Sequence, residues 1–236
     1  MNIIVAGGTG QVGLQVLNVL GRPSLQHAPS DSIYALVRRP GQVRPPIQEV
    51  VFDYEDGASY DGLFQKLKPS VLIIALGTTM KAAGSVAAFN RVDRDYPIQL
   101  IRSFAAHTAH QPSAVIAFVS SLGADKPMGT YLKAKYTVEE AIRETGKRFV
   151  IVRPSLLLSH RKEVRVGERV AEKLFAKPYL SFARHFAPKS NAVWKIAPIK
   201  VEQVAQALVQ ATTEVSQVSE KASQVGRVIE GLGFYR

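Results

Sequence analysis

The feature that most constrains the fold of this chain is a glycine-rich segment that follows its first apolar run. Residues 3–6 are apolar, residues 12–20 have the apolar spacing of a helix, and between them lies Gly7-Gly8-Thr9-Gly10-Gln11-Val12-Gly13. Glycine permits a tight turn and a close approach of the backbone to a ligand or a neighbouring element. The N-terminus of a helix attracts anions, because it carries free N–H groups and partial positive charge. The segment therefore predicts a strand, a turn and a helix that bind a phosphate group.

Short β-branched runs alternate with helical segments along the rest of the chain. Strands are expected at 33–37, 50–52, 71–76, 114–119, 149–152 and 227–230, and helices at 60–67, 86–106, 131–145 and 201–212. Strands separated by helices favour right-handed crossovers and a parallel sheet that is covered on both faces. We predict an α/β fold with a doubly wound parallel sheet of the Rossmann, NAD(P)-binding type. One domain would span 1–236, with a small C-terminal substrate-side lobe formed mainly by 155–200.

The composition indicates a globular protein and excludes several kinds of site. Hydrophobic residues make up 46% of the 236 residues, enough for a full core. The chain has no cysteine, which removes disulfides and thiolate chemistry, and its five histidines lack the spacing of a metal site. The first apolar run begins directly after Met1, and no run approaches the roughly 18 residues of a membrane span. We expect a cytoplasmic protein with no metal and no transmembrane segment.

Positive charge is concentrated in one part of the chain. Residues 143–200 hold 14 lysines and arginines against 4 acidic residues, so they account for +10 of the net charge of +11. Such a segment can attract nucleic acid, an anionic membrane, an acidic partner or a small anionic substrate, or it can be a solubilising surface. An amphipathic basic stretch at 166–186 leaves peripheral membrane contact open. No nucleic-acid-binding motif accompanies it, so the sequence does not favour DNA or RNA.

Two arginines follow the second expected strand, where NAD-binding domains usually carry an acidic residue. The guanidinium groups of Arg38 and Arg39 suit a 2′-phosphate, so the sequence favours NADP(H), with NAD(H) as the alternative. A simpler interpretation is two exposed arginines in a loop. Asp53, after the third strand, can accept a hydrogen bond from the adenine amino group or form a local turn.

A tyrosine and a lysine four residues apart begin the helix expected at 131–145. Tyr131 and Lys135 share one helix face, and an ammonium beside a phenol stabilises the phenolate, so the phenol can act as an acid or a base. The pair alone is a common surface pattern. Ser120 and Ser121 end the preceding strand, where a hydroxyl can bind the same substrate oxygen, and of the two we choose Ser121. All of these groups fall at the carboxyl ends of strands, where ligands of parallel sheets bind.

Together these motifs resemble the short-chain dehydrogenase/reductase superfamily, in particular its atypical branch, with a sheet like that of the extended members. The resemblance rests on the glycine segment, Ser121, the Tyr131 and Lys135 pair, and Arg153-Pro154. Further segments resemble the Tat-interacting-protein oxidoreductases: LGTT at 76–79, VDRDY at 92–96, SSLGADK at 120–126 and VRPSLLLSHR at 152–161. The similarity covers roughly residues 3–205.

The resemblance implies a role for each candidate residue. Tyr131 would be the general acid/base, Lys135 would hold the nicotinamide ribose, and Ser121 would orient the substrate carbonyl. Residues 76–78 would pass over the ribose and pyrophosphate of the cofactor, and residues 154–156 would approach the nicotinamide amide. The candidate cofactor-binding residues are Gly7, Thr9, Gly10, Gln11, Val12, Gly13, Arg38, Arg39, Asp53, Leu76, Gly77, Thr78, Tyr131, Lys135, Pro154, Ser155 and Leu156.

The chain also departs from the family pattern. Asp93 stands where many extended members have an asparagine, which puts an asparagine-based proton relay in doubt, and Ala6 replaces a frequent threonine. The stretch 155–200 is short for a sugar-nucleotide lobe, so epimerase or dehydratase chemistry is less favoured.

The leading hypothesis is an NADP(H)-dependent oxidoreductase that acts on a carbonyl or alcohol substrate. Residues 81–89, 156–160 and 179–186 would line its pocket, and their apolar and basic side chains suggest an anionic or amphipathic substrate. The alternative is a cofactor-sensing protein that uses NADP(H) occupancy to control a partner. The long helices at 86–106 and 131–145 could pair in a homodimer.

Overall fold

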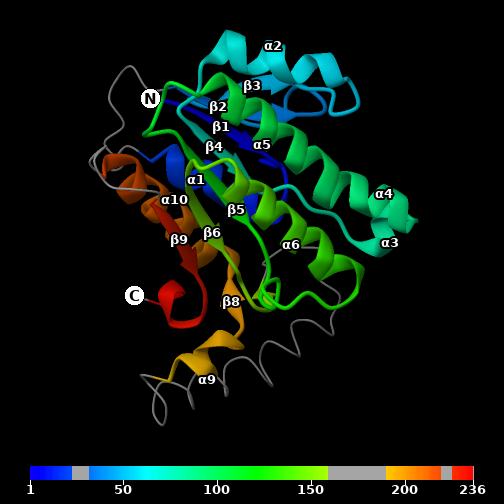
Figure 1. Ribbon diagram of the computed structural model, residues 1–236, viewed down its shortest axis with the longest axis vertical. Coiled ribbons are helices and arrows are strands. Elements are labelled where there is room, and N and C mark those ends of the chain that lie inside the picture. The colour runs from blue at the N-terminus through cyan, green and yellow to red at the C-terminus, as the bar shows by residue number, and fades with distance from the viewer. Residues whose placement is uncertain (23–31, 159–189, 219–224, 236) are drawn as a thin grey trace.

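Seven parallel strands form the central sheet, in a computed structural model that describes residues 1–22, 32–158, 190–218 and 225–235 (Figure 1). The sheet order is β3-β2-β1-β4-β5-β6-β9. The strands are β1 (Asn2–Ala6), β2 (Ser32–Val37), β3 (Gln48–Val51), β4 (Val71–Ile74), β5 (Val115–Val119), β6 (Arg148–Val152) and β9 (Gly226–Ile229). The predicted α/β fold with a parallel sheet is therefore confirmed.

Helices cover both faces of the sheet, because the strands are apolar on both sides. Ile3 and Val5 of β1 contact one buried cluster, and Ile4 and Ala6 contact the other. The first cluster includes α1 (Gln11–Leu20) and α10 (Val201–Gln217). On the opposite face lie α2 (Gly57–Leu67), α5 (Tyr96–His107) and α6 (Gly129–Glu144), as Figure 1 shows. This arrangement is doubly wound, as the alternating pattern predicted.

The direction of winding changes at β1. From β1 the chain proceeds outward through β2 and β3, and then returns to place β4 on the other side of β1. The segments after β1 and β4 therefore turn to opposite faces of the sheet, and at such a switch point a doubly wound sheet is expected to form a crevice. This crevice is where a doubly wound sheet binds its ligand, and the glycine segment lies directly beside it.

The long helix expected at 86–106 is present with an irregular centre. It consists of α4 (Val86–Asn90), a π-helical segment η1 (Arg91–Asp95) and α5, which follow one another without a break. Several short elements were not predicted, because tertiary contacts hold them rather than a periodic pattern. They are α3 (Met80–Ala83), α9 (Asn191–Lys195), the parallel pair β7 (Leu157–Leu158) and β8 (Ile199–Lys200), and the 3₁₀ helix η3 (Gly231–Phe234).

Most of the expected substrate-side lobe lies outside the described residues. The gap 159–189 contains the amphipathic stretch at 166–186 and the pocket segment at 179–186. At the two ends of this gap, Leu157 pairs with Ile199 and Leu158 with Lys200. Among the helices that the structure describes, none is both long enough and apolar enough to cross a membrane.

Candidate functional site

The glycine segment packs so tightly that side chains would not fit at two of its positions. Gly7 has φ +87°, and a Cβ there would lie 2.6 Å from the carbonyl carbon of Ala75, which follows β4. A Cβ on Gly13 would lie 2.1 Å from the Gly7 oxygen, because the first turn of α1 rests on the loop. Gly10 is the N-cap of α1 and offers no side-chain cap to its N–H groups. This cradle of backbone donors suits the pyrophosphate of a dinucleotide.

The remaining residues of the segment divide between surface and core. Thr9 and Gln11 are exposed beside the turn, where their polar groups can reach a ligand. Val12 is buried and packs in the core against the sheet. Val12 therefore supports the loop from beneath and can offer a ligand only its backbone.

Arg38 and Arg39 directly follow β2 and are exposed. Within the described ranges, neither side chain has a hydrogen bond or an ion pair, so both guanidinium groups are available to an anion. The loop beyond them is held by Glu49 of β3, whose carboxylate accepts backbone hydrogen bonds from Gly41, Gln42 and Val43. These bonds, led by the one from Val43, lower the pKa of Glu49.

Asp53 has the role of a turn residue. Its Oδ1 accepts a hydrogen bond from the Glu55 backbone N–H at 2.9 Å, and its backbone carbonyl accepts one from the Ser59 hydroxyl at 3.0 Å. This geometry is the local-turn alternative left open by the sequence. The residue is also exposed, so its second carboxylate oxygen faces solvent at this edge.

Lys135 lies in a buried ion pair with Asp93. The two side chains are 4% and 1% exposed, and Lys135 Nζ lies 3.1 Å from Asp93 Oδ1. Asp93 Oδ2 accepts a hydrogen bond from the Thr78 backbone N–H at 2.7 Å, and Lys135 Nζ donates to the Leu76 carbonyl at 3.4 Å. The pair thus joins η1 and α6 to the segment after β4, which the resemblance places over the cofactor.

Tyr131 precedes Lys135 by one turn of α6 and is 42% exposed. Its ring lies against the buried ring of Phe89, with 6.1 Å between the centroids, and Lys135 Nζ lies 6.0 Å from the centroid of the tyrosine ring. The phenol is therefore accessible while the ammonium beneath it is not. This is the arrangement that a general acid at the entrance of a site requires.

The two adjacent serines after β5 have different surroundings. Ser120 is buried, and its hydroxyl donates to Glu139 Oε1 at 2.5 Å. Ser121 is half-buried, and its hydroxyl has no hydrogen bond within the part of the chain that the structure describes. Ser121 is therefore the hydroxyl that remains free to bind a substrate.

A buried charge cluster lies behind the serines. Glu139 is fully buried, and its two carboxylate oxygens accept hydrogen bonds from Arg153 Nε at 3.0 Å and Nη2 at 2.6 Å. Burial favours the neutral acid, but the hydrogen bonds from Arg153 and Ser120 outweigh it and lower the pKa of Glu139. Arg143 adds a third donor at 3.1 Å. The cluster fixes α6 against the carboxyl ends of β5 and β6.

Three residues follow β6 in the predicted site: Pro154 and Ser155 make hydrogen bonds within the protein, and Leu156 is exposed. The Pro154 carbonyl accepts a hydrogen bond from the Leu122 N–H at 2.9 Å, and the Ser155 hydroxyl donates to the Ala197 carbonyl. Leu156 is 69% exposed. Ser155 therefore supports the β7 and β8 pair, and only Leu156 presents a free side chain.

Asp93 and Glu139 received no role from the sequence, although both contact predicted site residues or their neighbours. A signal exists for Glu139, because it continues the four-residue spacing of Tyr131 and Lys135 along one face of α6. Asp93 has no such local spacing, since its partner Lys135 lies 42 positions away in the chain, but its place at the asparagine position of the family pattern is a signal.

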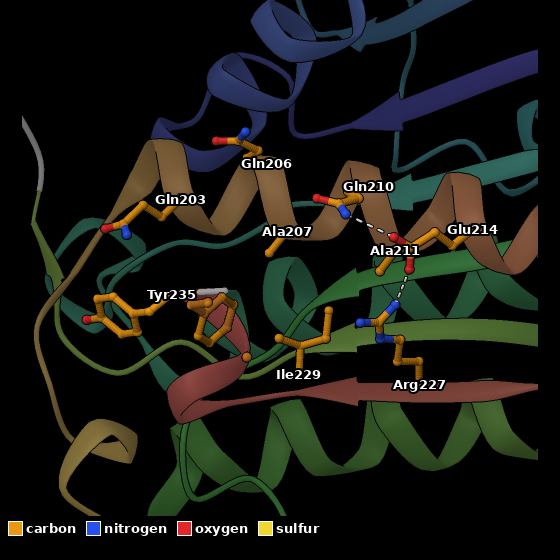
Figure 2. A pocket seen from close by; sticks show the side chains of 11 residues that line it. Gln203, Gln206, Ala207, Gln210, Ala211, Glu214, Arg227, Ile229 and Tyr235 are labelled. Carbon is orange, nitrogen blue, oxygen red and sulfur yellow. Dashed lines mark hydrogen bonds and ion pairs between the residues drawn. The ribbon is translucent and has the colours of Figure 1, made fainter. Parts of the chain in front are cut away.

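A separate hollow of about 350 Å³ lies between α10 and β9. Figure 2 shows Gln210, Glu214 and Arg227 joined by hydrogen bonds along its rim, with Ile229 and Tyr235 lining it as well. None of the predicted site residues lines this hollow. The candidate site is instead the crevice at the carboxyl ends of the strands.

Comparison with known families agrees with this geometry. A family model described as NAD(P)H-binding matches residues 7–184, more than half of the chain. The chain belongs to this NAD(P)H-binding family. Its curated relatives include the mitochondrial protein fmp52 of Emericella nidulans, 30% identical over 83% of this chain and 85% of that protein. Protein HTATIP2 of Rattus norvegicus is 37% identical over 59% of this chain and 55% of that protein, which confirms the Tat-interacting-protein resemblance.

Solved structures share the fold of this chain over nearly its whole length. An oxidoreductase of the short chain dehydrogenase/reductase family from Burkholderia thailandensis aligns with a TM-score of 0.67 at 15% identity, over 100% of this chain and 93% of that one. WbmH of Bordetella bronchiseptica, solved in complex with NAD+, aligns with a TM-score of 0.64 at 12% identity, over 97% and 75%. At these identities the likeness establishes the shared α/β fold.

The relatives contradict the expectation of a cytoplasmic protein. The fmp52 proteins of Emericella nidulans and Saccharomyces cerevisiae, which are 30% and 31% identical to this chain, are both named as mitochondrial. The expectation relied on features of secretory signals and membrane spans. Those features do not distinguish the cytoplasm from the mitochondrion.

Proposed function

We propose that this family member is an NADP(H)-dependent oxidoreductase that interconverts a carbonyl and an alcohol. One observation carries the proposal: the accessible phenol of Tyr131 lies above the buried ammonium of Lys135. Ser121, whose hydroxyl makes no hydrogen bond to any described residue, follows β5 and supplies a second donor. These are the groups that a hydride transfer to a carbonyl needs.

Each residue would have a separate role in this reaction. A bound nicotinamide supplies the hydride for reduction or accepts it in oxidation. In reduction, the Ser121 hydroxyl would donate a hydrogen bond to the substrate carbonyl oxygen, and the Tyr131 hydroxyl would give that oxygen the proton of the alcohol. In oxidation, Tyr131 takes the proton back. Lys135, whose ammonium lies 6.0 Å from the centroid of the Tyr131 ring, would hold the nicotinamide ribose.

The preference for NADP(H) is supported by Arg38 and Arg39. Both are exposed directly after β2, beside the strand that carries the glycine cradle. A planar guanidinium can bind a phosphate through two hydrogen bonds, whereas the 2′-hydroxyl of NAD(H) offers it little.

The test is turnover of a panel of aldehydes and ketones with NADPH. Tyr131→Phe should lower turnover by at least about 100-fold and leave NADPH affinity nearly intact, because it removes the proton donor while Lys135, the glycine cradle and the arginines stay in place. Tyr136→Phe on the same helix, also exposed, is the matched control and should keep full activity. Equal turnover in wild type and Tyr131→Phe would overturn the mechanism, and NADPH binding with no turnover of any substrate would favour the cofactor-sensing alternative.

A further inference from the structure

We propose that the carbonyl substrate of this site carries an aliphatic chain, which lies against an apolar rim around Tyr131 and Ser121. The rim consists of Val86, Met128, Leu156 and Ile196. The inference rests on the proposed function, because it takes Tyr131 and Ser121 as the groups that bind the reacting carbonyl. It narrows the anionic or amphipathic substrate expected from the sequence to one with an aliphatic chain.

The first support is the exposure of large apolar side chains at the carboxyl ends of the strands. Met128 lies between β5 and α6 and is 81% exposed, and Leu156, four residues after β6, is 69% exposed. Ile196 and Val86 are 60% and 50% exposed. Single apolar residues are common on protein surfaces, but several on neighbouring segments mark a binding site.

Leu156 and Ile196 are brought together by the β7 and β8 pair. The Leu156 carbonyl accepts a hydrogen bond from the Ile199 N–H at 2.9 Å, and the Ser155 hydroxyl donates to the Ala197 carbonyl. Ile196 directly precedes Ala197, so the two exposed side chains belong to neighbouring backbones. They form the side of the rim that lies beyond the end of β6.

A backbone hydrogen bond joins this side of the rim to the segment that carries Ser121. The Leu122 N–H donates to the Pro154 carbonyl at 2.9 Å. Leu122 directly follows Ser121, and Pro154 precedes Leu156 by two residues. The reacting carbonyl and the apolar side chains beyond β6 are therefore within reach of one small molecule.

Val86 and Met128 lie on the two helices that meet at Tyr131. The Phe89 ring of α4 lies against the Tyr131 ring, with 6.1 Å between the centroids, and Val86 is three residues before Phe89 on the same face. Met128 is the N-cap of α6, three residues before Tyr131. Figure 1 shows α3 and α4 beside the first turns of α6. Each helix thus carries an exposed apolar side chain next to the phenol.

The chain that leads to Phe89 is poor in charge. Residues 80–89 have the sequence MKAAGSVAAF, in which Lys81 is the one charged residue. A sugar or phosphate substrate needs several hydrogen-bond donors or cations beside its reacting group, whereas an aliphatic chain needs only apolar surface from which it can displace water. The composition of this side of the site therefore favours the aliphatic chain.

The experiment measures kcat/KM with NADPH for linear aldehydes from propanal to octanal. A fully buried methylene raises affinity about fourfold, and one that lies against an open rim gains about half of that free energy, or about twofold. We therefore expect kcat/KM to rise by about 30-fold over the five added methylenes. In the double variant Val86→Ser with Met128→Ser, the ratio of octanal to propanal should fall to about 5. Val228→Ser, exposed on β9, is the matched control and should keep the ratio of wild type.

Two results would overturn the inference while the proposed function stands. They are an equal kcat/KM for all aldehydes in wild type, and a ratio in the double variant that equals that of wild type. Neutral phosphatidylcholine vesicles test the other use of such a rim. Sedimentation of wild type but not of the double variant with these vesicles, without an effect of chain length on turnover, would assign the rim to a lipid surface and would also overturn the inference.

A binding measurement separates failure of the inference from failure of the proposed function. Octanamide and propanamide, which resist reduction, are titrated calorimetrically into the NADPH complex. If no aldehyde is reduced but octanamide binds more tightly than propanamide, and the double variant loses this difference, the proposed function fails and the apolar site stands. If no aldehyde is reduced and the two amides bind alike, both fail.

Discussion

At the scale of single residues, the site depends on buried charges that are stabilised by hydrogen bonds and by residues of opposite charge. Glu139 is the clearest case, since Arg153, Ser120 and Arg143 all donate to its carboxylate. The spacing of Tyr131 and Lys135 could be predicted from the sequence. The contacts of Asp93 with Lys135 and Thr78, and those of Glu139 with Ser120 and Arg153, join separate segments and are visible only in the folded structure.

We expect Glu139→Gln to lower the free energy of unfolding by about 1.5–3 kcal/mol, because the charged hydrogen bonds from Arg153 to Glu139 are lost, while Asp125 and Glu230 remain as counter-charges at 3.7 and 3.9 Å. Urea denaturation followed by circular dichroism measures this change. Glu140→Gln is the matched control, since Glu140 is half-exposed and, among the described residues, forms an ion pair only with Arg143. A control loss as large as that of Glu139→Gln would contradict the account.

The same cluster predicts a pH dependence. The pKa of Glu139 is lowered in the folded protein from an ordinary value of 4.5. As the pH falls below about 4.5, the unfolded chain takes up this proton first, so the stability that Glu139 contributes above that pH is progressively lost. The unfolding free energy of wild type should therefore fall more steeply with acid than that of Glu139→Gln, when both are measured by urea denaturation across a pH series. Parallel curves would show that Glu139 is not ionised in the fold as described.

At the scale of elements, the unit of β1, its glycine turn and α1 was predictable because its signal is local. The strand, the turn and the helix are contiguous in the chain, and each glycine has a steric reason to be there. The long helix at 86–106 was also predicted from its periodicity, but η1 within it was not. Apolar spacing does not reveal a π-helical turn, and the short β7 and β8 pair depends on contacts across the gap 159–189.

Gly13→Ala tests the tight packing in this unit. The added Cβ would lie 2.1 Å from the Gly7 oxygen, so α1 must move away from the turn. We expect NADPH binding to be lost and the melting temperature to fall, measured by calorimetry and thermal denaturation. Gly62→Ala in α2 is the control, because its Cβ meets open space, and it should stabilise the protein by about 0.5–1 kcal/mol. Unimpaired NADPH binding by Gly13→Ala would count against the cradle.

At the scale of the whole molecule, the sheet order gathers the candidate residues at one edge. The winding reverses at β1. Because the strands are parallel, the segments that follow β1, β2, β4, β5 and β6 all begin at the same edge of the sheet, where the strands have their carboxyl ends. The alternation of strands and helices was enough to predict this arrangement. The cellular compartment was not predictable in the same way, because neither the fold nor the site depends on it.

Binding of NADP(H) by the glycine cradle and Arg38 can be measured by calorimetric titration of wild type, Arg38→Asp and Arg102→Asp with NADPH and NADH. Arg102 is exposed on α5, so its variant makes the same change in net charge away from the end of β2. We predict that wild type and Arg102→Asp bind NADPH about tenfold or more tightly than NADH, and that Arg38→Asp loses this preference. Equal affinity of wild type for the two cofactors, or binding of neither, would contradict the account.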